Sequence, residues 1–372
     1  MNPPDDRAPA TRRPGPAEDT GTVTDPAHGE LVISPDAGQT LAVPGGDVPE
    51  FVDGLPLTAA EAGYIAASRA PNTLRGYRND WKEFTTWCAH TGRDPLPAAP
   101  DTISTYLVAL ADANAKVGTI SRRLSSIRFA HATRDLPDPT STARVTAVWE
   151  GIRRTHGAPP EQSAPLMPPQ LLEVLDACPR TRTWKTRPDE PDLAGLRDRA
   201  LLLVGFWSAL RRAELAALTV DQVAEHPGGR VLTVPRSKTN QHGEVAELAV
   251  LPYAADPALC PVTALTTWTD AAAITDGPLL RPVSTGNRAL ARRLNPESLN
   301  TLVQAAVARA GIDPTPYSAH SLRAGFVTYA HLNGATDRDI AHQTRHRSLS
   351  TIDTYIRVER AWHNNAATQL GL

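Results

Sequence analysis

The chain has 372 residues, 41% of them hydrophobic, and a formal net charge of −2 at pH 7. This length suffices for two domains and a tail. Because no apolar run approaches the ~18 residues of a membrane helix, we exclude a membrane protein. The three cysteines, Cys88, Cys178 and Cys260, are odd in number and far apart. Their spacing fits neither a disulfide framework nor a zinc site, so we expect a reducing, cytoplasmic location.

The charge is unevenly distributed along the chain. Residues 1–55 hold ten acidic and three basic side chains, a balance of −7, whereas the rest holds 35 basic and 30 acidic ones, a balance of +5. The segment 1–55 is rich in Pro, Gly, Asp and Thr without sustained periodicity, which predicts a disordered acidic tail. The mildly basic remainder keeps nucleic acid open as a partner, because affinity depends on where charge clusters and not on the total.

Residues 56–157 have the periodicity of helices. A capping box over residues 58–61 starts the first helix, and apolar residues recur at helical spacing through most of the segment. Further helices are expected over 72–90, 103–113, 120–133 and 142–156. The segment 158–166 that follows contains three prolines and is typical of an extended linker.

Residues 167–372 combine helical periodicity with a short alternating region. Two period-two segments, 230–235 and 245–252, flank a polar turn that carries Lys238, which predicts a β-hairpin. Asp198 and Arg199 are expected on the polar face of their helix. Helices are expected over 169–178, 193–209, 211–217, 261–274, 296–310, 318–332, 336–344 and 349–357, and a final amphipathic stretch over 361–370. The predicted fold class is therefore mainly α, with a small antiparallel sheet in a mixed α+β second domain.

Four side chains near the C-terminal end indicate phosphodiester chemistry. His320 and Arg323 lie three residues apart and share one face of a helix. Arg grips phosphate oxygens through forked donors, and His moves a proton near neutral pH. His346 and Tyr355 follow within the same segment, and a tyrosine can act as a covalent nucleophile.

With two earlier motifs, these residues resemble the tyrosine recombinase (phage integrase) family. That family carries Arg-x-x-Glu, a lysine in a hairpin, His-x-x-Arg, a second His or Trp, and then a Tyr. The sequence holds the same order as Arg211 to Glu214, Lys238, His320 to Arg323, His346 and Tyr355. The resemblance covers roughly residues 57–372. It implies a helical core-binding domain, a SAM-like bundle, at 56–157, the linker at 158–166 and a catalytic domain at 167–372.

The resemblance implies a role for each motif residue. Arg211 and Arg323 would neutralise the two non-bridging oxygens of the phosphate, and Tyr355 would be the nucleophile. His320 would carry the proton of the attacking phenol or hydrogen-bond the phosphate, and His346 would support charge on a non-bridging oxygen. The spacing favours Arg211 over its neighbour Arg212 as the motif arginine.

Two further residues complete the expected site. Lys238 would protonate the leaving 5′ oxygen, and Glu214 would hold the turn of Arg211 as a structural support. The residue before His346 is usually glycine in the family, but here it is Arg345. Because glycine reaches positive φ without strain, this departure leaves the geometry of the turn open.

The resemblance implies a site-specific DNA recombinase that works through a 3′-phosphotyrosyl intermediate, without metal, ATP or another cofactor. Its expected partners are double-stranded DNA and three further copies in a homo-tetramer on two DNA sites. Two alternatives stay open: topoisomerase-like relaxation of DNA, and a non-catalytic DNA-binding accessory protein. The sequence leaves undecided the target site, accessory proteins, and whether integration, excision, resolution or transposition is served. The expected phosphate contacts in the first domain are Arg75, Arg78, Arg122, Arg123 and Arg128.

Overall fold

The computed structural model describes residues 69–159, 162–182, 189–234 and 246–346, together with Tyr64, Ser348, Leu349, Ile352 and Tyr355. Several sequence predictions fall outside these residues. They are the acidic tail 1–55, the helix start at 58–61, the polar turn that carries Lys238, and the amphipathic stretch 361–370.

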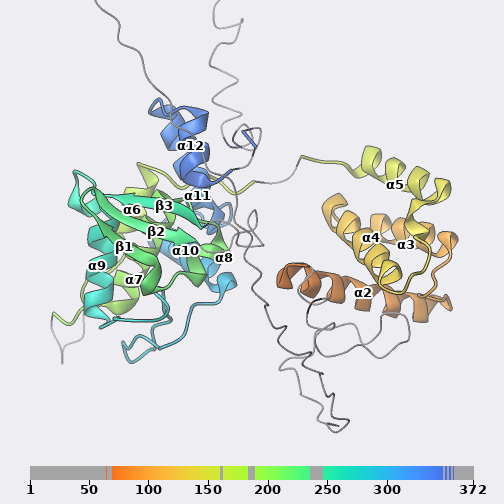
Figure 1. Cartoon of the computed structure of the whole chain (residues 1–372), viewed down its shortest axis with the longest axis horizontal. Coiled ribbons are helices and arrows are strands. Elements are labelled where there is room, and N and C mark those ends of the chain that lie inside the picture. Colours follow the sequence, from red (N-terminus) through yellow and green to blue (C-terminus); the bar gives the residue numbers. More distant parts are fainter. Residues whose placement is uncertain are drawn as a thin grey trace, which may run out of the picture. The chain divides into compact units, whose positions relative to one another are not determined.

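The first domain is a bundle of helices, drawn in orange to yellow in Figure 1. Its core contains Phe84, Ile103, Leu107, Ile120 and Val145, all of them nearly inaccessible to solvent. The periodicity of the sequence predicted these helices because each one turns such an apolar stripe inward. The helices are α2 (Pro71–Thr91), α3 (Pro100–Asp112), α4 (Val117–Ala132) and α5 (Ala143–His156), with a 3₁₀ turn η1 (Pro139–Ser141) before α5.

The second domain contains a small antiparallel sheet with the strand order β1-β2-β3. Its strands are β1 (Val223–His226), β2 (Gly229–Val234) and β3 (Glu247–Pro252). Strands β2 and β3 were predicted; β1 was not, because three of its four residues are exposed and show no alternation. Its helices are α6 (Gln170–Asp176), α7 (Leu193–Ser208), α8 (Arg212–Ala217), α9 (Pro261–Ala271), α10 (Pro296–Arg309), α11 (His320–Leu332) and α12 (Asp337–Thr344), with 3₁₀ turns η2 (Val220–Gln222) and η3 (Pro257–Leu259).

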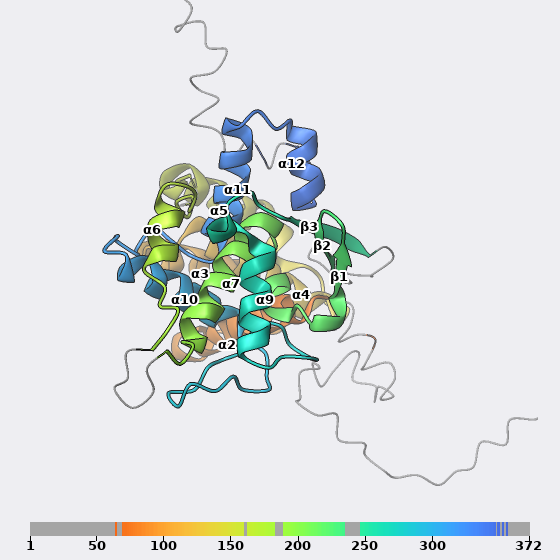
Figure 2. The same ribbon diagram turned by 90° about the vertical axis from the view of Figure 1, so that its left-hand side faces the viewer.

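Helix α7 is the centre of the second domain. It packs along α9, as Figure 2 shows, and also contacts α11 and β3. Gly205 permits the contact with α11, because a Cβ there would lie 2.6 Å from Cδ1 of Leu322. Asp198 and Arg199, expected on the polar face of this helix, are both buried. Asp198 accepts hydrogen bonds from Arg197 and from Arg309, a partner on α10 that the sequence pattern does not reveal.

Helices α11 and α12 form a hairpin that carries part of the C-terminal segment. Gly334, with φ of 84°, turns the chain after α11, and the hydroxyl of Thr336 caps α12 by accepting from the N–H of Asp339. Ile352, fully buried, packs with Val327 of α11 and Ile340 of α12. This small core positions Tyr355, which lies three residues beyond Ile352 and is helical.

The predicted fold class is confirmed: the chain is mainly helical, with a helical N-terminal domain and a mixed second domain that holds a small antiparallel sheet. None of the helices in the described part of the chain has the length and apolar content needed to cross a membrane. The domain boundaries stay predictions. Leu166, at the end of the predicted linker, is fully buried in the core of the second domain, and its N–H donates to the carbonyl of Ser321.

Candidate active site

Tyr355 and His320 lie in hydrogen-bonding contact. The phenol oxygen of Tyr355 is 3.0 Å from Nε2 of His320, the first residue of α11. The ring of His346 also lies beside Tyr355, and the centroids of the two rings are 5.9 Å apart. Desolvation by the surrounding protein, and then the charges of Arg323 and Arg211, lower the pKa of His320 although the residue is partly accessible. A neutral imidazole is thereby favoured, and a neutral imidazole can accept the phenol proton.

Arg323 lies one turn further along α11 and is 1% exposed. Its Nη1 donates to the carbonyl of Ala209, and its Nη2 donates to the carbonyl of Thr344 and to Nε2 of His346, at 2.7 and 2.8 Å. Its Nε has no hydrogen-bond partner within the described parts of the chain. Burial and then the charge of Arg211 lower the pKa of Arg323 to about 10, so it remains a cation at neutral pH.

Arg211 stands at the start of α8, after a sharp turn. Ala209 ends α7 in the left-handed conformation, with φ of 47°, which redirects the chain into α8. Glu214 then holds Arg211 twice: Oε2 accepts from the backbone N–H at 3.0 Å and Oε1 accepts from Nη1 at 2.9 Å. The guanidinium of Arg211 stays partly accessible, because its side chain is 21% exposed.

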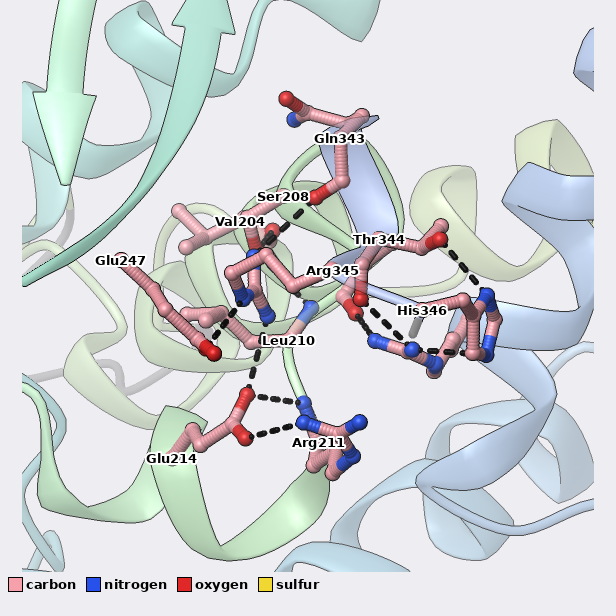
Figure 3. A network of polar contacts seen from close by, with 12 residues as sticks. Val204, Ser208, Leu210, Arg211, Glu214, Glu247, Gln343, Thr344, Arg345 and His346 are labelled. Carbon is pink, nitrogen blue, oxygen red and sulfur yellow. Dashed lines mark hydrogen bonds and ion pairs between the residues drawn. The ribbon is translucent and has the colours of Figure 1, made fainter. Parts of the chain in front are cut away.

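His346 follows the C-cap of α12. Arg345 occupies that cap in the left-handed conformation, with φ of 57° and ψ of 42°, so arginine adopts the conformation for which glycine is usual. Nδ1 of His346 lies 2.7 Å from the hydroxyl oxygen of Thr344, as Figure 3 shows. Burial, followed by the charges of Arg323 and Arg211, lowers the pKa of His346 to about 3. His346 is therefore neutral at physiological pH.

Comparison with known proteins identifies this arrangement. Residues 170–361 match the phage integrase family, and residues 64–133 match the phage integrase N-terminal SAM-like domain. The first match spans more than half of the chain. The chain belongs to the phage integrase family. The tyrosine recombinase predicted from the order of the motifs is therefore confirmed as the class of this enzyme.

Individual relatives agree with this membership. The recombinase is 34% identical to the integrase/recombinase xerD homolog of Selenomonas ruminantium over 309 residues, 82% of this chain and 87% of the relative. It is 26% identical to the recombinase cre of Escherichia phage P1 over 159 residues, 42% of this chain and 45% of the relative. The XerH recombinase structure bound to palindromic difH matches at a TM-score of 0.53 with 15% identity, over 81% of this chain and 82% of that one. That likeness supports the fold alone.

The recombinase thus brings together five of the six predicted catalytic residues. Arg211, Arg323, His320, His346 and Tyr355 come from three places in the sequence and meet between α8, α11 and the end of α12. Lys238 lies outside the described residues, so its place in the site stays a prediction. Strands β2 and β3, which flank it in sequence, are paired from Gly229–Pro252 to Val234–Glu247.

Three of the arginines predicted to bind DNA pair with acids of the first domain of the recombinase. Arg122 donates from Nε and Nη2 to both oxygens of Asp80, at 2.7 and 2.9 Å. Arg123 pairs with Glu83 and donates to the phenol of Tyr106, and Arg128 donates to Asp138. Arg75 is exposed and donates to the neutral amide of Asn72; Arg78 is exposed as well. A DNA phosphate would compete with carboxylates at the first three and not at Arg75.

Two contributors to the site were not predicted from the sequence. Thr344 contacts His346, and Arg345 reaches Glu214 through a hydrogen bond of 2.9 Å. They are the two residues before His346, so their position next to a predicted catalytic residue was a signal in the sequence. Nothing in the sequence pattern reveals that Arg345 meets a carboxylate 131 residues away.

Proposed function

We propose that this recombinase cuts and rejoins double-stranded DNA at specific sites through a 3′-phosphotyrosyl intermediate on Tyr355. The observation that carries the proposal is the 3.0 Å separation between the phenol oxygen of Tyr355 and Nε2 of His320. A phenol is a poor nucleophile until it loses its proton, and a neutral imidazole at that distance can take it. The lowered pKa of His320 supports its neutral form.

The proposed cleavage step is a transesterification at phosphorus. The phenol oxygen of Tyr355 forms a bond to phosphorus while its proton passes to Nε2 of His320. The bond between phosphorus and the 5′ oxygen breaks, and that oxygen takes a proton from Lys238, the general acid that the family resemblance implies. The DNA ends as a 3′-phosphotyrosine and a free 5′ hydroxyl. Attack of a 5′ hydroxyl from the partner duplex reverses the chemistry, so the ester conserves the bond energy and neither ATP nor a metal ion is required.

The negative charge on the non-bridging oxygens is stabilised, in this proposal, by Arg211, Arg323 and His346. Two guanidinium groups held by protein contacts before the reaction stabilise the doubly charged phosphorane without reorganising. The Nε of Arg323, buried and without a hydrogen-bond partner among the described residues, is a donor of the kind that an oxyanion would satisfy. In this proposal Glu214 supports the site by holding Arg211, and it does not act as a base.

Double-stranded DNA is the proposed substrate, and the names of solved neighbours support it. XerH is described in complex with difH, and lambda integrase residues 75–356, matched at a TM-score of 0.51 and 17% identity over 78% of this chain and 91% of that one, is described as a dimer on a core site. For this chain we propose a homo-tetramer on two DNA sites in the cytoplasm. The acidic segment 1–55, the core-binding domain 56–157, the linker 158–166 and the catalytic domain 167–372 are its proposed parts.

The decisive experiment uses a DNA site with a nick just downstream of the scissile phosphate, so that the short fragment with the free 5′ hydroxyl is lost and the covalent product accumulates. The wild type should form a covalent protein–DNA adduct. Tyr355→Phe should form none while binding DNA within a few-fold of the wild type. Tyr329→Phe is the matched control, since Tyr329 is an exposed tyrosine of α11, and it should form the adduct normally.

Other outcomes separate the alternatives. An adduct with relaxation of supercoiled DNA but no exchange between two sites would indicate a topoisomerase-like activity. A mobility shift without any adduct in the wild type would indicate a non-catalytic DNA-binding protein. An adduct that persists in Tyr355→Phe would overturn the assignment of the nucleophile.

A further inference from the structure

Arg345 combines a strained backbone with a buried cationic side chain. Its φ of 57° lies in the left-handed region, which costs energy for any residue with a Cβ. Its side chain is 5% exposed, so the guanidinium is largely removed from water. Both features are unfavourable by themselves, so the contacts of the side chain have to offset them.

The side chain reaches two acidic residues from different elements. Nη2 donates to Oε2 of Glu214 on α8 at 2.9 Å, and Nε lies 3.5 Å from Oε2 of Glu247 on β3. Nη1 donates to the carbonyl of Gln343 at 3.1 Å, within its own turn. Figure 3 shows Arg345 between the two carboxylates, with Arg211 on the far side of Glu214.

Glu214 is therefore shared between two arginines. Oε1 accepts from Nη1 of Arg211, while Oε2 accepts from the backbone of Arg211 and from Nη2 of Arg345. The side chain of Glu214 is 4% exposed, so water has little access to it. A carboxylate held at both oxygens has a fixed plane, and a fixed carboxylate orients the guanidinium that it accepts from. Without Arg345, one of these constraints on Glu214 is lost.

We infer that Arg345 is a positioning residue that, through Glu214, fixes the guanidinium of Arg211 for the DNA phosphate. The same contact joins the turn that carries His346 to the start of α8, so two phosphate-binding elements keep one geometry. This inference rests on the proposed function in that Arg211 is taken to bind the scissile phosphate. Arg345 itself touches neither the nucleophile nor His320 in any contact of the described residues.

Three substitutions separate positioning from general stability. Arg345→Gly removes the side chain; relief of the backbone strain offsets only part of the cost of leaving the buried Glu214 with one partner fewer, so the variant should stay folded with a melting temperature below that of the wild type. Arg345→Lys keeps one donor to Glu214 but lacks the forked N–H donors of the guanidinium. Arg212→Ala is the matched control, because Arg212 is an accessible neighbour of Arg211. Nη2 of Arg212 lies 3.5 Å from Glu297.

The first readout is the order of the Arg211 side chain, followed through its ¹⁵Nε–¹H signal in the full chain without DNA. The signal should report a rigid side chain in the wild type and in Arg212→Ala, a mobile one in Arg345→Gly, and an intermediate one in Arg345→Lys. A rigid Arg211 in Arg345→Gly would overturn the inference. This readout needs no turnover, so it decides the inference even if the wild type forms no adduct and the proposed function fails.

The second readout is the rate of adduct formation at saturating DNA. We expect about a tenfold or greater loss in Arg345→Gly, a partial recovery in Arg345→Lys, and no change in Arg212→Ala. In an Arg211→Lys background, Arg345→Gly should change the rate less than about twofold, because Arg211, the residue that Arg345 positions, has already been replaced. Additive losses in the double variant, or a rate in Arg345→Gly within about twofold of wild type, would contradict the inference.

Discussion

Arg323 donates a hydrogen bond from Nη2 to Nε2 of His346 across 2.8 Å, and this contact fixes where the imidazole carries its proton. A guanidinium has only donors, so Nε2 is the acceptor and the neutral ring is protonated at Nδ1. Nδ1 lies 2.7 Å from the hydroxyl of Thr344, which itself donates to the carbonyl of Ile340 at 2.7 Å. In this arrangement His346 donates to Thr344 and presents no N–H at Nε2.

This tautomer predicts a change on DNA binding. The ¹⁵N spectrum of the DNA-free protein should show His346 protonated at Nδ1 alone, with the signal assigned by comparison with His346→Gln. Adding a DNA site to Tyr355→Phe should protonate Nε2, because a hydrogen bond to a phosphate oxygen needs an N–H there. Thr344→Ser and Thr344→Val should both keep the DNA-free tautomer, because each leaves the Arg323 contact in place. Finding Nε2 protonated before DNA is added would refute the assignment.

The same residue predicts how stability depends on pH. His346 is kept neutral in the folded state because its pKa is lowered from 6.5 to about 3, while the unfolded chain protonates it near pH 6.5. Its contribution to stability is therefore complete above pH 6.5 and is lost as the pH falls toward 3. Between pH 6.5 and 5 the free energy of unfolding should fall by up to ~1.4 kcal/mol per pH unit from this residue.

Chemical denaturation at several pH values measures that slope. His346→Gln, which cannot titrate, should have a shallower slope over the same range. His90→Gln serves as the control, since His90 is an exposed residue of α2, and it should leave the slope unchanged. If His346→Gln and the wild type have parallel curves from pH 6.5 to 5, the folded protein does not hold His346 neutral.

The elements that the sequence predicted well are those with a strong local signal. Helix α2 was expected over 72–90 and spans Pro71–Thr91, because its apolar residues repeat at helical spacing. Strand β1 was missed because it is held by pairing with β2, as in Val223 opposite Leu232, and not by its own pattern. The burial of Asp198 could not be predicted, because its partner Arg309 lies 111 residues away.

The same contrast between local signals and long-range contacts holds for the site. The order of the motifs predicted which residues to examine, and five of them meet in space. The departure at Arg345 raised the question of its turn, but the answer depends on a carboxylate of α8 that only the tertiary structure brings near. Long-range contacts of this kind leave no periodicity in the sequence, which is why Thr344 and Arg345 were not predicted as parts of the site.

The arginines of the first domain should separate into those that stabilise the fold and those that bind DNA. Asp80 is 2% exposed and accepts from Arg122 through both oxygens. Arg122→Ala should therefore lower stability by about 1–3 kcal/mol, since it leaves a buried acceptor with one partner fewer. Arg75 is exposed, and its partner among the described residues is the neutral amide of Asn72. Arg75→Ala should leave stability unchanged and weaken DNA binding.

Salt titrations of DNA affinity check this division. Loss of one phosphate contact reduces the slope of log affinity against log salt by about 1. We expect that reduction for Arg75→Ala and an unchanged slope for Arg122→Ala, with thermal unfolding of both variants measured in parallel. The reverse pattern would show that Arg122 contacts DNA in spite of its carboxylate partner.

Lys238 is assigned to protonation of the leaving 5′ oxygen. The 5′ oxygen departs as an alkoxide unless it is protonated, and its conjugate acid is an alcohol about as weak an acid as water. A general acid is therefore worth about 10²–10⁴ in rate at this step. Lys238→Ala should reduce adduct formation by that factor on ordinary DNA while leaving DNA binding within a few-fold.

Sulfur in place of the bridging 5′ oxygen tests the role of Lys238 directly. A thiolate has a conjugate acid with a pKa of about 8.5 and leaves without a proton, so Lys238→Ala should cleave such DNA nearly as fast as the wild type. Arg323→Ala should gain no such rescue, because Arg323 is assigned to the non-bridging oxygens, which the sulfur does not change. If sulfur fails to restore Lys238→Ala, the lysine orients the DNA and does not donate the proton. The proton of the leaving group would then have to come from His320, the other group of the site that can carry one and that lies beside Tyr355.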